Sequence, residues 1–185
     1  MEFLAIVSSK WHPDDVQPNI IVPFANDKSD PGVLAATRLN LTMQGLKPRY
    51  ERLNGTLDSL YSYDRLFRKL WAENEPFIIV EHDILPWPGA LQQMWLCDKP
   101  WCGFEYLCLG ELRVQLGCVK FDPSRLGPVP LPEELTPWHT LDWIIISTLA
   151  NRGESGHLHE PAVSHLNYGH QRATEAMVLR PEPLP

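Results

Sequence analysis

The sequence predicts an α/β fold, a single domain in which a mixed, mostly parallel sheet is flanked by helices. Short apolar runs alternate along the chain with longer runs of helical periodicity, which is the pattern of β-α-β-α-β units. The apolar run 77–80 holds β-forming residues throughout, as is typical of a strand that is covered on both faces. A length of 185 residues fits one domain with a sizeable core.

The first half of the chain supplies three strands before the acidic segment. Residues 3–7 and 19–24 are short apolar runs that predict strands. A helix over 31–45 is expected, because Pro31 suits an early helical position and Gly45 suits a helix end. Residues 49–53 predict a further strand.

The second half continues the alternation. A helix over 57–71 is predicted by apolar residues at helical spacing, and the strand 77–80 follows it. The remaining expected elements are a helix at 89–97, strands at 101–106 and 115–121, and an apolar helix at 140–151. Trp71, Trp95 and Trp143 lie on apolar faces of these helices and are expected in the core.

Prolines mark two irregular segments. The chain contains 18 prolines, and they cluster at 126–137 and in the last five residues, where neither helix nor central strand is expected. We therefore expect one compact domain over residues 1–180 and a proline-rich tail over 181–185.

Composition narrows the class of protein. A net charge of −7 disfavours extensive nucleic-acid binding, which needs a basic surface. The sequence shows no signal segment and no apolar run of membrane-spanning length, so no membrane association and a cytoplasmic location are expected. The four cysteines form no Cys-x-x-Cys pair and are expected to be reduced thiols in the core.

The most informative segment is the end of the strand 77–80. Glu81 and Asp83 follow it directly, and in open α/β sheets ligands bind at the carboxyl ends of the strands. A pair of carboxylates there suits a hard divalent cation with a phosphate ligand, such as Mn²⁺ or Mg²⁺. The alternative is an acidic loop that caps the next helix.

A neighbouring strand end could hold a nucleotide. Pro23, Phe24, Asn26 and Asp27 end the strand 19–24, where a base and a ribose could bind beside the metal. The sequence has no Gly-x-Gly-x-x-Gly and no Gly-Lys-Ser/Thr loop. Phosphate charge would have to be met by a cation or by basic side chains instead.

Five segments in order resemble motifs of one enzyme family. Residues 62–66 resemble a helix motif with Tyr-x-Arg-Leu, and residues 77–85 resemble a strand that ends in Asp-x-Asp, with Glu81 in place of the first Asp. Residues 116–121 resemble an Asn-Ser-Gly-Val strand without its Asn, and residues 141–143 resemble an Asp-Gln-Asp segment of which Asp142 remains. Residues 165–169 resemble a His-x-x-x-Gly motif. The family is that of metal-dependent GT-A fold glycosyltransferases, in particular the glycogenin and lipopolysaccharide galactosyltransferase group.

This resemblance implies a site and a reaction. Glu81, Asp83 and His165 would hold Mn²⁺ or Mg²⁺, with Glu81 also on the ribose. Arg65 would reach the donor, and Gly169 would let a loop approach the diphosphate. Asp142 would be the catalytic residue, either as a base or as a partner of a donor-sugar hydroxyl. The reaction implied is transfer from a nucleoside diphosphate sugar, in the first place a UDP-sugar, to an unidentified hydroxyl on a glycan, a protein or a modified base.

Two other readings remain open. His157 and His159 could chelate zinc from a strand, and together with His165 they would suit a zinc-dependent hydrolase. A non-catalytic nucleotide-binding module would share the strand-end features without the chemistry. A zinc site would hold its metal without nucleotide, whereas the transferase site should need the diphosphate to complete the coordination of a hard cation.

Overall fold

The computed structural model describes residues 17–25, 31–53, 59–108, 111–160 and 162–166. Several expectations lie outside these residues: the strand at 3–7, the proposed nucleotide contacts Asn26 and Asp27, Gly169, and the tail at 181–185.

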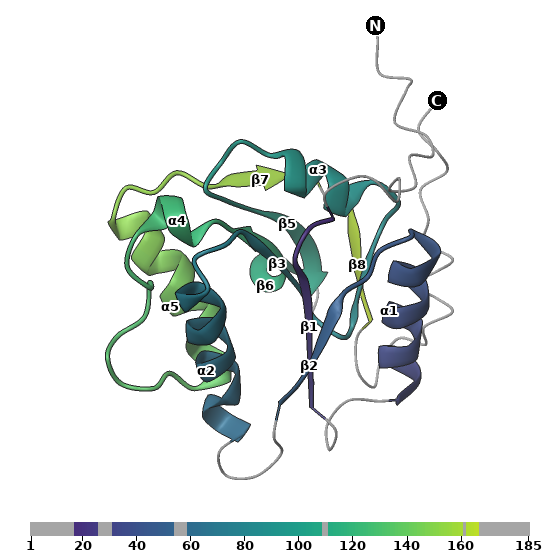
Figure 1. Cartoon of the computed structure of the whole chain (residues 1–185), viewed down its shortest axis with the longest axis horizontal. Coiled ribbons are helices and arrows are strands. Elements are labelled where there is room, and N and C mark those ends of the chain that lie inside the picture. The colour runs from purple at the N-terminus through teal and green to yellow at the C-terminus, as the bar shows by residue number, and fades with distance from the viewer. Residues whose placement is uncertain (1–16, 26–30, 54–58, 109–110, 161, 167–185) are drawn as a thin grey trace, which may run out of the picture.

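A mixed, six-stranded sheet forms the centre of the described part of the chain (Figure 1). Its order is β2 (Arg49–Leu53), β1 (Ile20–Ala25), β3 (Phe77–Val80), β6 (Glu111–Phe121), β5 (Trp101–Cys108) and β7 (His157–His159). β1 pairs in parallel with β2 and β3, and β5 pairs in parallel with β7, whereas β6 is antiparallel to both of its neighbours. Every strand of this sheet except β6 therefore runs in the same direction, and the predicted α/β class is confirmed.

The described part also holds a second, two-stranded sheet, which the sequence did not predict. β4 (Ile84–Pro86) pairs antiparallel with β8 (Val163–His165). Strands of three residues leave little local signal, and a chain-distant partner supplies their hydrogen bonds. The same holds for β7, which is also three residues long.

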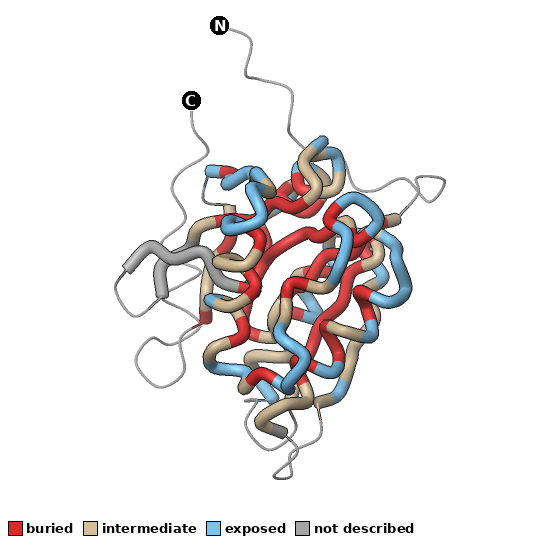
Figure 2. The backbone as a smooth tube through the Cα atoms, turned by 90° about the vertical axis from the view of Figure 1, so that its left-hand side faces the viewer, coloured by how far each residue is buried: buried red, intermediate tan, exposed pale blue. Residues whose placement is uncertain are grey.

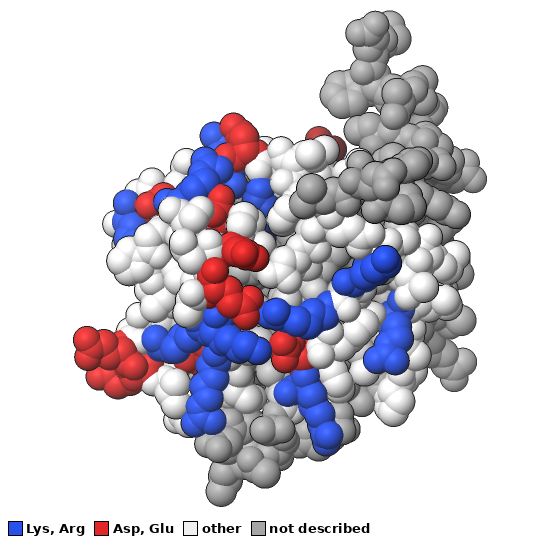
Figure 3. Space-filling view, viewed as in Figure 1, with Lys and Arg blue, Asp and Glu red and all other residues white. Residues whose placement is uncertain are grey.

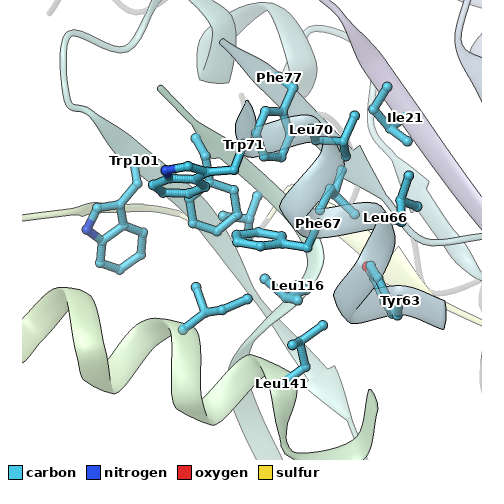
Figure 4. Close-up of a cluster of buried hydrophobic side chains, with 14 of the residues drawn as sticks. Ile21, Tyr63, Leu66, Phe67, Leu70, Trp71, Phe77, Trp101, Leu116 and Leu141 are labelled. Carbon is cyan, nitrogen blue, oxygen red and sulfur yellow. The ribbon is translucent and has the colours of Figure 1, made fainter. Parts of the chain in front are cut away.

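Helices cover both faces of the large sheet. α1 (Pro31–Met43) and α3 (Ala90–Leu96) lie on one face, whereas α2 (Ser59–Ala72), α5 (Trp138–Asn151) and the short α4 (Pro123–Leu126) lie on the other (Figure 1). Each face buries its own apolar cluster, and the central strand β3 is buried along its whole length (Figure 2). Figure 4 shows the cluster under α2 and α5, in which the rings of Phe67, Trp71 and Phe77 pack among aliphatic side chains. No helix in the described residues is both long and apolar enough to cross a membrane.

Helix α5 differs from its expected start and from its expected contacts. It begins at Trp138, so Asp142 lies within the helix rather than at its amino-terminal cap. Leu141, Ile145 and Leu149, at intervals of one turn, form its buried face. Trp143 lies off that face with 74 % of its surface exposed, so the expectation that it belongs to the core is wrong.

The proline-rich segment 127–137 is irregular, as predicted, and α2 fixes it in place. Asp64 is fully buried, accepts a hydrogen bond from the backbone N–H of Thr136 at 2.9 Å, and pairs with Arg68. The Arg68 guanidinium also donates to the carbonyl of Pro132 at 2.6 Å. Residue 64 of the Tyr-x-Arg-Leu segment is therefore structural.

Candidate functional site

The turn after β3 is held rigidly from two sides. The backbone N–H of Glu81 donates to the carbonyl of Gly117 on β6 at 2.8 Å, and the N–H of Ile84 donates back to the carbonyl of Glu81 at 3.0 Å. From the other side, the hydroxyl of the buried Thr37 on α1 donates to the carbonyl of His82 at 2.6 Å. The side chains at 81 and 83 are thus placed by strand, turn and helix together.

The small sheet brings His165 to Asp83. Ile84 is in register with His165, and the N–H of Leu166 donates to the carbonyl of Asp83 at 2.7 Å. His165 Nε2 lies 3.3 Å from Asp83 Oδ2. Asp83 is only 7 % exposed, and its Oδ1 atom is buried without a hydrogen-bond partner among the described residues.

Glu81 lies close to both Asp83 and Asp142. Burial, together with the charges of Asp142 and Asp83, raises the pKa of Glu81 well above its ordinary value, although the nearby Tyr63 hydroxyl acts in the opposite direction. Burial also raises the pKa of Asp142 to about 6, while the backbone N–H of Leu116 on β6 donates to its carboxylate and limits the rise. The strand end, the helix α5 and the small sheet therefore direct Glu81, Asp83, Asp142 and His165 to one place.

These four side chains offer charge and a ligand atom to a divalent cation, but they do not complete its coordination. Buried carboxylates near one another are costly unless an opposite charge offsets them, and the partnerless Oδ1 of Asp83 offers a ligand atom. Among the described residues, however, no three of these four side chains bring their ligand atoms within 4.8 Å of one another. Such a set suits a hard cation that takes the rest of its ligands from phosphate oxygens and water.

The residues expected to bind nucleotide lie along the next strands. Pro23 is in register with Glu51 and Phe24 with Arg52, which places the end of β1 beside the end of β2. A surface pocket of about 260 Å³ lies over β2 and α2 and contains Arg65. Its lining residues are Glu51, Arg52, Leu53, Ser62, Arg65, Leu66 and Lys69. Figure 3 shows Lys and Arg side chains over α2, β2 and α1, with Asp and Glu side chains among them.

The three histidines of the hydrolase reading do not form one ligand group in the described structure. His165 pairs with Asp83, whereas His159 lies with Cys97 and Cys102. His157 stacks edge-on against His159, with 4.4 Å between the ring centroids.

Three contributors to the site were not predicted from the sequence. Tyr63 lowers the pKa of Glu81, and it lies at the end of the core cluster away from Trp101 (Figure 4). Thr37 holds the turn, and His82, whose pKa is lowered by burial and raised in part by Asp83, lies within it. The only signal in the sequence is a polar group on a helix face that is otherwise buried, at residues 37 and 63.

Comparisons with known proteins support the fold. No family model matches the chain, and no curated protein matches it. A solved structure, A197 from STIV, aligns with a TM-score of 0.54 over 80 % of this chain and 86 % of that one, at 7 % identity. At this identity the likeness is one of fold alone.

Proposed function

We propose that the protein is a metal-dependent glycosyltransferase that uses a nucleoside diphosphate sugar, in the first place a UDP-sugar. One observation carries the proposal: the side chains of Glu81, Asp83, Asp142 and His165, from three separate parts of the chain, meet at the carboxyl edge of the sheet. This is the edge at which α/β sheets bind ligands. The motif resemblance points to the same residues.

Each residue has a defined task in this proposal. Asp83 and His165, with Glu81, would hold Mn²⁺ or Mg²⁺. The bound cation would neutralise the negative charge that develops on the departing diphosphate. A mixed set of carboxylates and one imidazole suits Mn²⁺ slightly better than Mg²⁺. Tyr63, close to Glu81, would favour the ionised carboxylate that a cation requires.

Asp142 is the residue proposed to act on the sugar or on the acceptor. Its pKa of about 6 leaves it mostly ionised at neutral pH and close to the value at which a general base works best. It would either take a proton from the acceptor hydroxyl or accept a hydrogen bond from a donor-sugar hydroxyl. Its place within α5, hydrogen-bonded to β6, removes helix capping as the reason for an acid at this position.

The donor would extend from the cation towards β2. Pro23 and Phe24 lie at the end of β1, and the pocket with Arg65 lies beyond them on the neighbouring strand. Arg65, Arg52 and Lys69 offer positive charge in that pocket, as a chain without a glycine-rich phosphate loop requires.

A thermal-shift experiment tests the proposal directly. Purified protein is heated with UDP, ADP, GDP or uridine, each in Mn²⁺, in Mg²⁺ or in chelator, because a ligand that binds the native state raises the melting temperature. We expect UDP to stabilise only in the presence of the cation, and uridine to stabilise weakly.

Three outcomes would speak against it. Equal stabilisation by UDP in chelator would contradict the metal role, and no response to any nucleotide would contradict the donor class. Nucleotide binding without release of UDP from a UDP-sugar panel, in water or with acceptor mixtures, would favour a non-catalytic nucleotide-binding module.

A further inference from the structure

A second group of potential metal ligands is formed by residues that the proposed transfer reaction does not use. The thiols of Cys97 and Cys102 and a ring nitrogen of His159 all lie within 4.8 Å of one another. Both cysteines are free thiols. The three residues come from the end of α3, from β5 and from the edge strand β7.

Strand register explains why the group forms. β5 and β7 are parallel, with Cys102 opposite His157 and Phe104 opposite His159. Because side chains two apart share one face of a strand, Cys102 and both histidines project to the face that α3 covers. Cys97 ends α3 on that face, where its N–H donates to the carbonyl of Met94 at 3.2 Å.

The ring of His159 offers a buried nitrogen atom to a ligand. The side chain is only 7 % exposed, yet its Nε2 atom is buried without a hydrogen-bond partner among the residues that the structure describes. A buried ring nitrogen left in this state is costly, and a bound cation would satisfy it. Burial lowers the pKa of His159 to about 4, so the ring is neutral at physiological pH and its lone pair is available to a metal.

The charge of Lys120 offsets part of the cost of forming a thiolate at Cys102. Its ammonium is buried, with 5 % of the residue exposed, and donates to the carbonyl of Cys97 at 2.5 Å. Burial raises the pKa of the Cys102 thiol, and the nearby Lys120 charge opposes that rise. Two thiolates and one lysine leave one negative charge, which a divalent ion would more than offset.

We propose that Cys97, Cys102 and His159 bind a thiophilic divalent cation, with zinc as the expected ion. Two sulfurs and one imidazole are typical zinc ligands, whereas the hard cations proposed for the Asp83 site prefer oxygen. His157, whose ring lies against His159, is a candidate for a fourth ligand.

Bound metal would tie β7 to the sheet. β7 is an edge strand paired to β5 over three residues, and Gly156 leads into it against the indole of Trp101, where a Cβ would collide with ring carbons. A link from His159 to α3 and β5 would hold this short strand in register. The inference does not depend on the glycosyltransferase proposal.

Cobalt binding tests the site. Reduced, metal-free full-length protein is titrated with Co²⁺ in the presence of a phosphine reductant, and the thiolate-to-cobalt charge-transfer band is recorded. We expect the band and the intense visible absorption of a tetrahedral site at one equivalent, and loss of both on addition of Zn²⁺. Zn²⁺ should also raise the melting temperature in the absence of nucleotide.

Variants locate the ligands. Cys97→Ser, Cys102→Ser and His159→Gln should each abolish the band, while Cys118→Ala, which removes another buried thiol, should retain it. Asp83→Asn should retain it too, since that residue belongs to the other site. If Cys102→Ser fails to fold, the partly exposed Cys97 still decides the matter. Absence of the band in folded, reduced wild type, or its persistence in folded Cys97→Ser, would overturn the proposal.

Discussion

Asp83 and His165 make contact through Oδ2 and Nε2 at 3.3 Å, although one follows β3 and the other ends β8. The pairing of β4 with β8 sets this contact, because Ile84 and His165 are in register. The second oxygen of Asp83 stays buried without a partner among the described residues. In the proposed metal site this pair would supply two of the ligands.

The first prediction concerns Asp83→Asn. The amide keeps the shape of the side chain but loses the charge that a cation requires, so stabilisation by UDP with Mn²⁺ should disappear. Without ligands the variant should melt at or above the temperature of the parent, since a buried charge has been removed. Differential scanning fluorimetry measures both effects. Asp98→Asn, an exposed position, is the matched control, and a normal Mn²⁺-dependent shift in Asp83→Asn would refute the assignment.

The second prediction concerns Asp142→Asn and separates stability from activity. The folded-state pKa of about 6 lies above the ordinary value of 3.8, so folding favours the protonated acid and the contribution of Asp142 to stability falls as pH rises through this range. At neutral pH the Asn variant should therefore be more stable, by on the order of 1 kcal/mol. Chemical denaturation at pH 4 and pH 7 should show the gain mainly at pH 7.

The same variant should turn over far less donor. Loss of a general base or of a sugar-positioning carboxylate should lower turnover by roughly a hundredfold or more and spare donor affinity. UDP release and calorimetric donor binding measure the two quantities. A variant that is stabilised and fully active would leave Asp142 without a role in the reaction.

The third prediction concerns Tyr63→Phe. The Tyr63 hydroxyl lowers the pKa of Glu81, so its removal should raise that pKa further and make the carboxylate harder to ionise. Cation-dependent UDP binding should then be lost at a higher pH than in the parent as the solution is acidified. Tyr61→Phe, on the same helix, should leave the pH profile unchanged. An unshifted profile in Tyr63→Phe would mean that Glu81 ionisation does not limit binding.

The fourth prediction contrasts two arginines on α2. Arg65 is exposed in the pocket, whereas Arg68 pairs with the fully buried Asp64. Arg65→Ala should weaken nucleotide-sugar binding more than UDP binding, and should leave the free energy of unfolding little changed. Arg68→Ala should lower that free energy by about 2 kcal/mol or more, because it leaves a buried carboxylate without its cation. Urea unfolding and calorimetry of both variants make the comparison, and a reversed pattern would reject these roles.

Local patterns were sufficient for five strands of the large sheet, β1, β2, β3, β5 and β6, and for its acidic edge. Residues 77–80 form a strand because each is β-branched or apolar and both faces of that strand are covered, and Glu81 and Asp83 follow it as predicted. Helices α1 and α2 begin and end within two residues of their expected bounds.

The features that were not predicted from the sequence depend on residues that are distant along the chain. β4 and β8 exist because they pair with each other, so neither three-residue segment carries a signal alone. Along α5, three consecutive isoleucines hide the periodicity of the buried face, and Trp143 was therefore misplaced. The contact of Tyr63 with Glu81 requires the angle between α2 and β3, which no local pattern contains.

The pairing of β4 with β8 has a consequence for synthesis on the ribosome. Glu81 and Asp83 are synthesised before β5, β6 and β7. His165, which contacts Asp83, and Leu166, whose N–H donates to the Asp83 carbonyl, are synthesised only after β7. A nascent chain that stops short of β8 contains β1, β3, β5 and β6 but lacks His165. In the proposed transferase, affinity for the cation and the donor would therefore appear only after β8 has been synthesised.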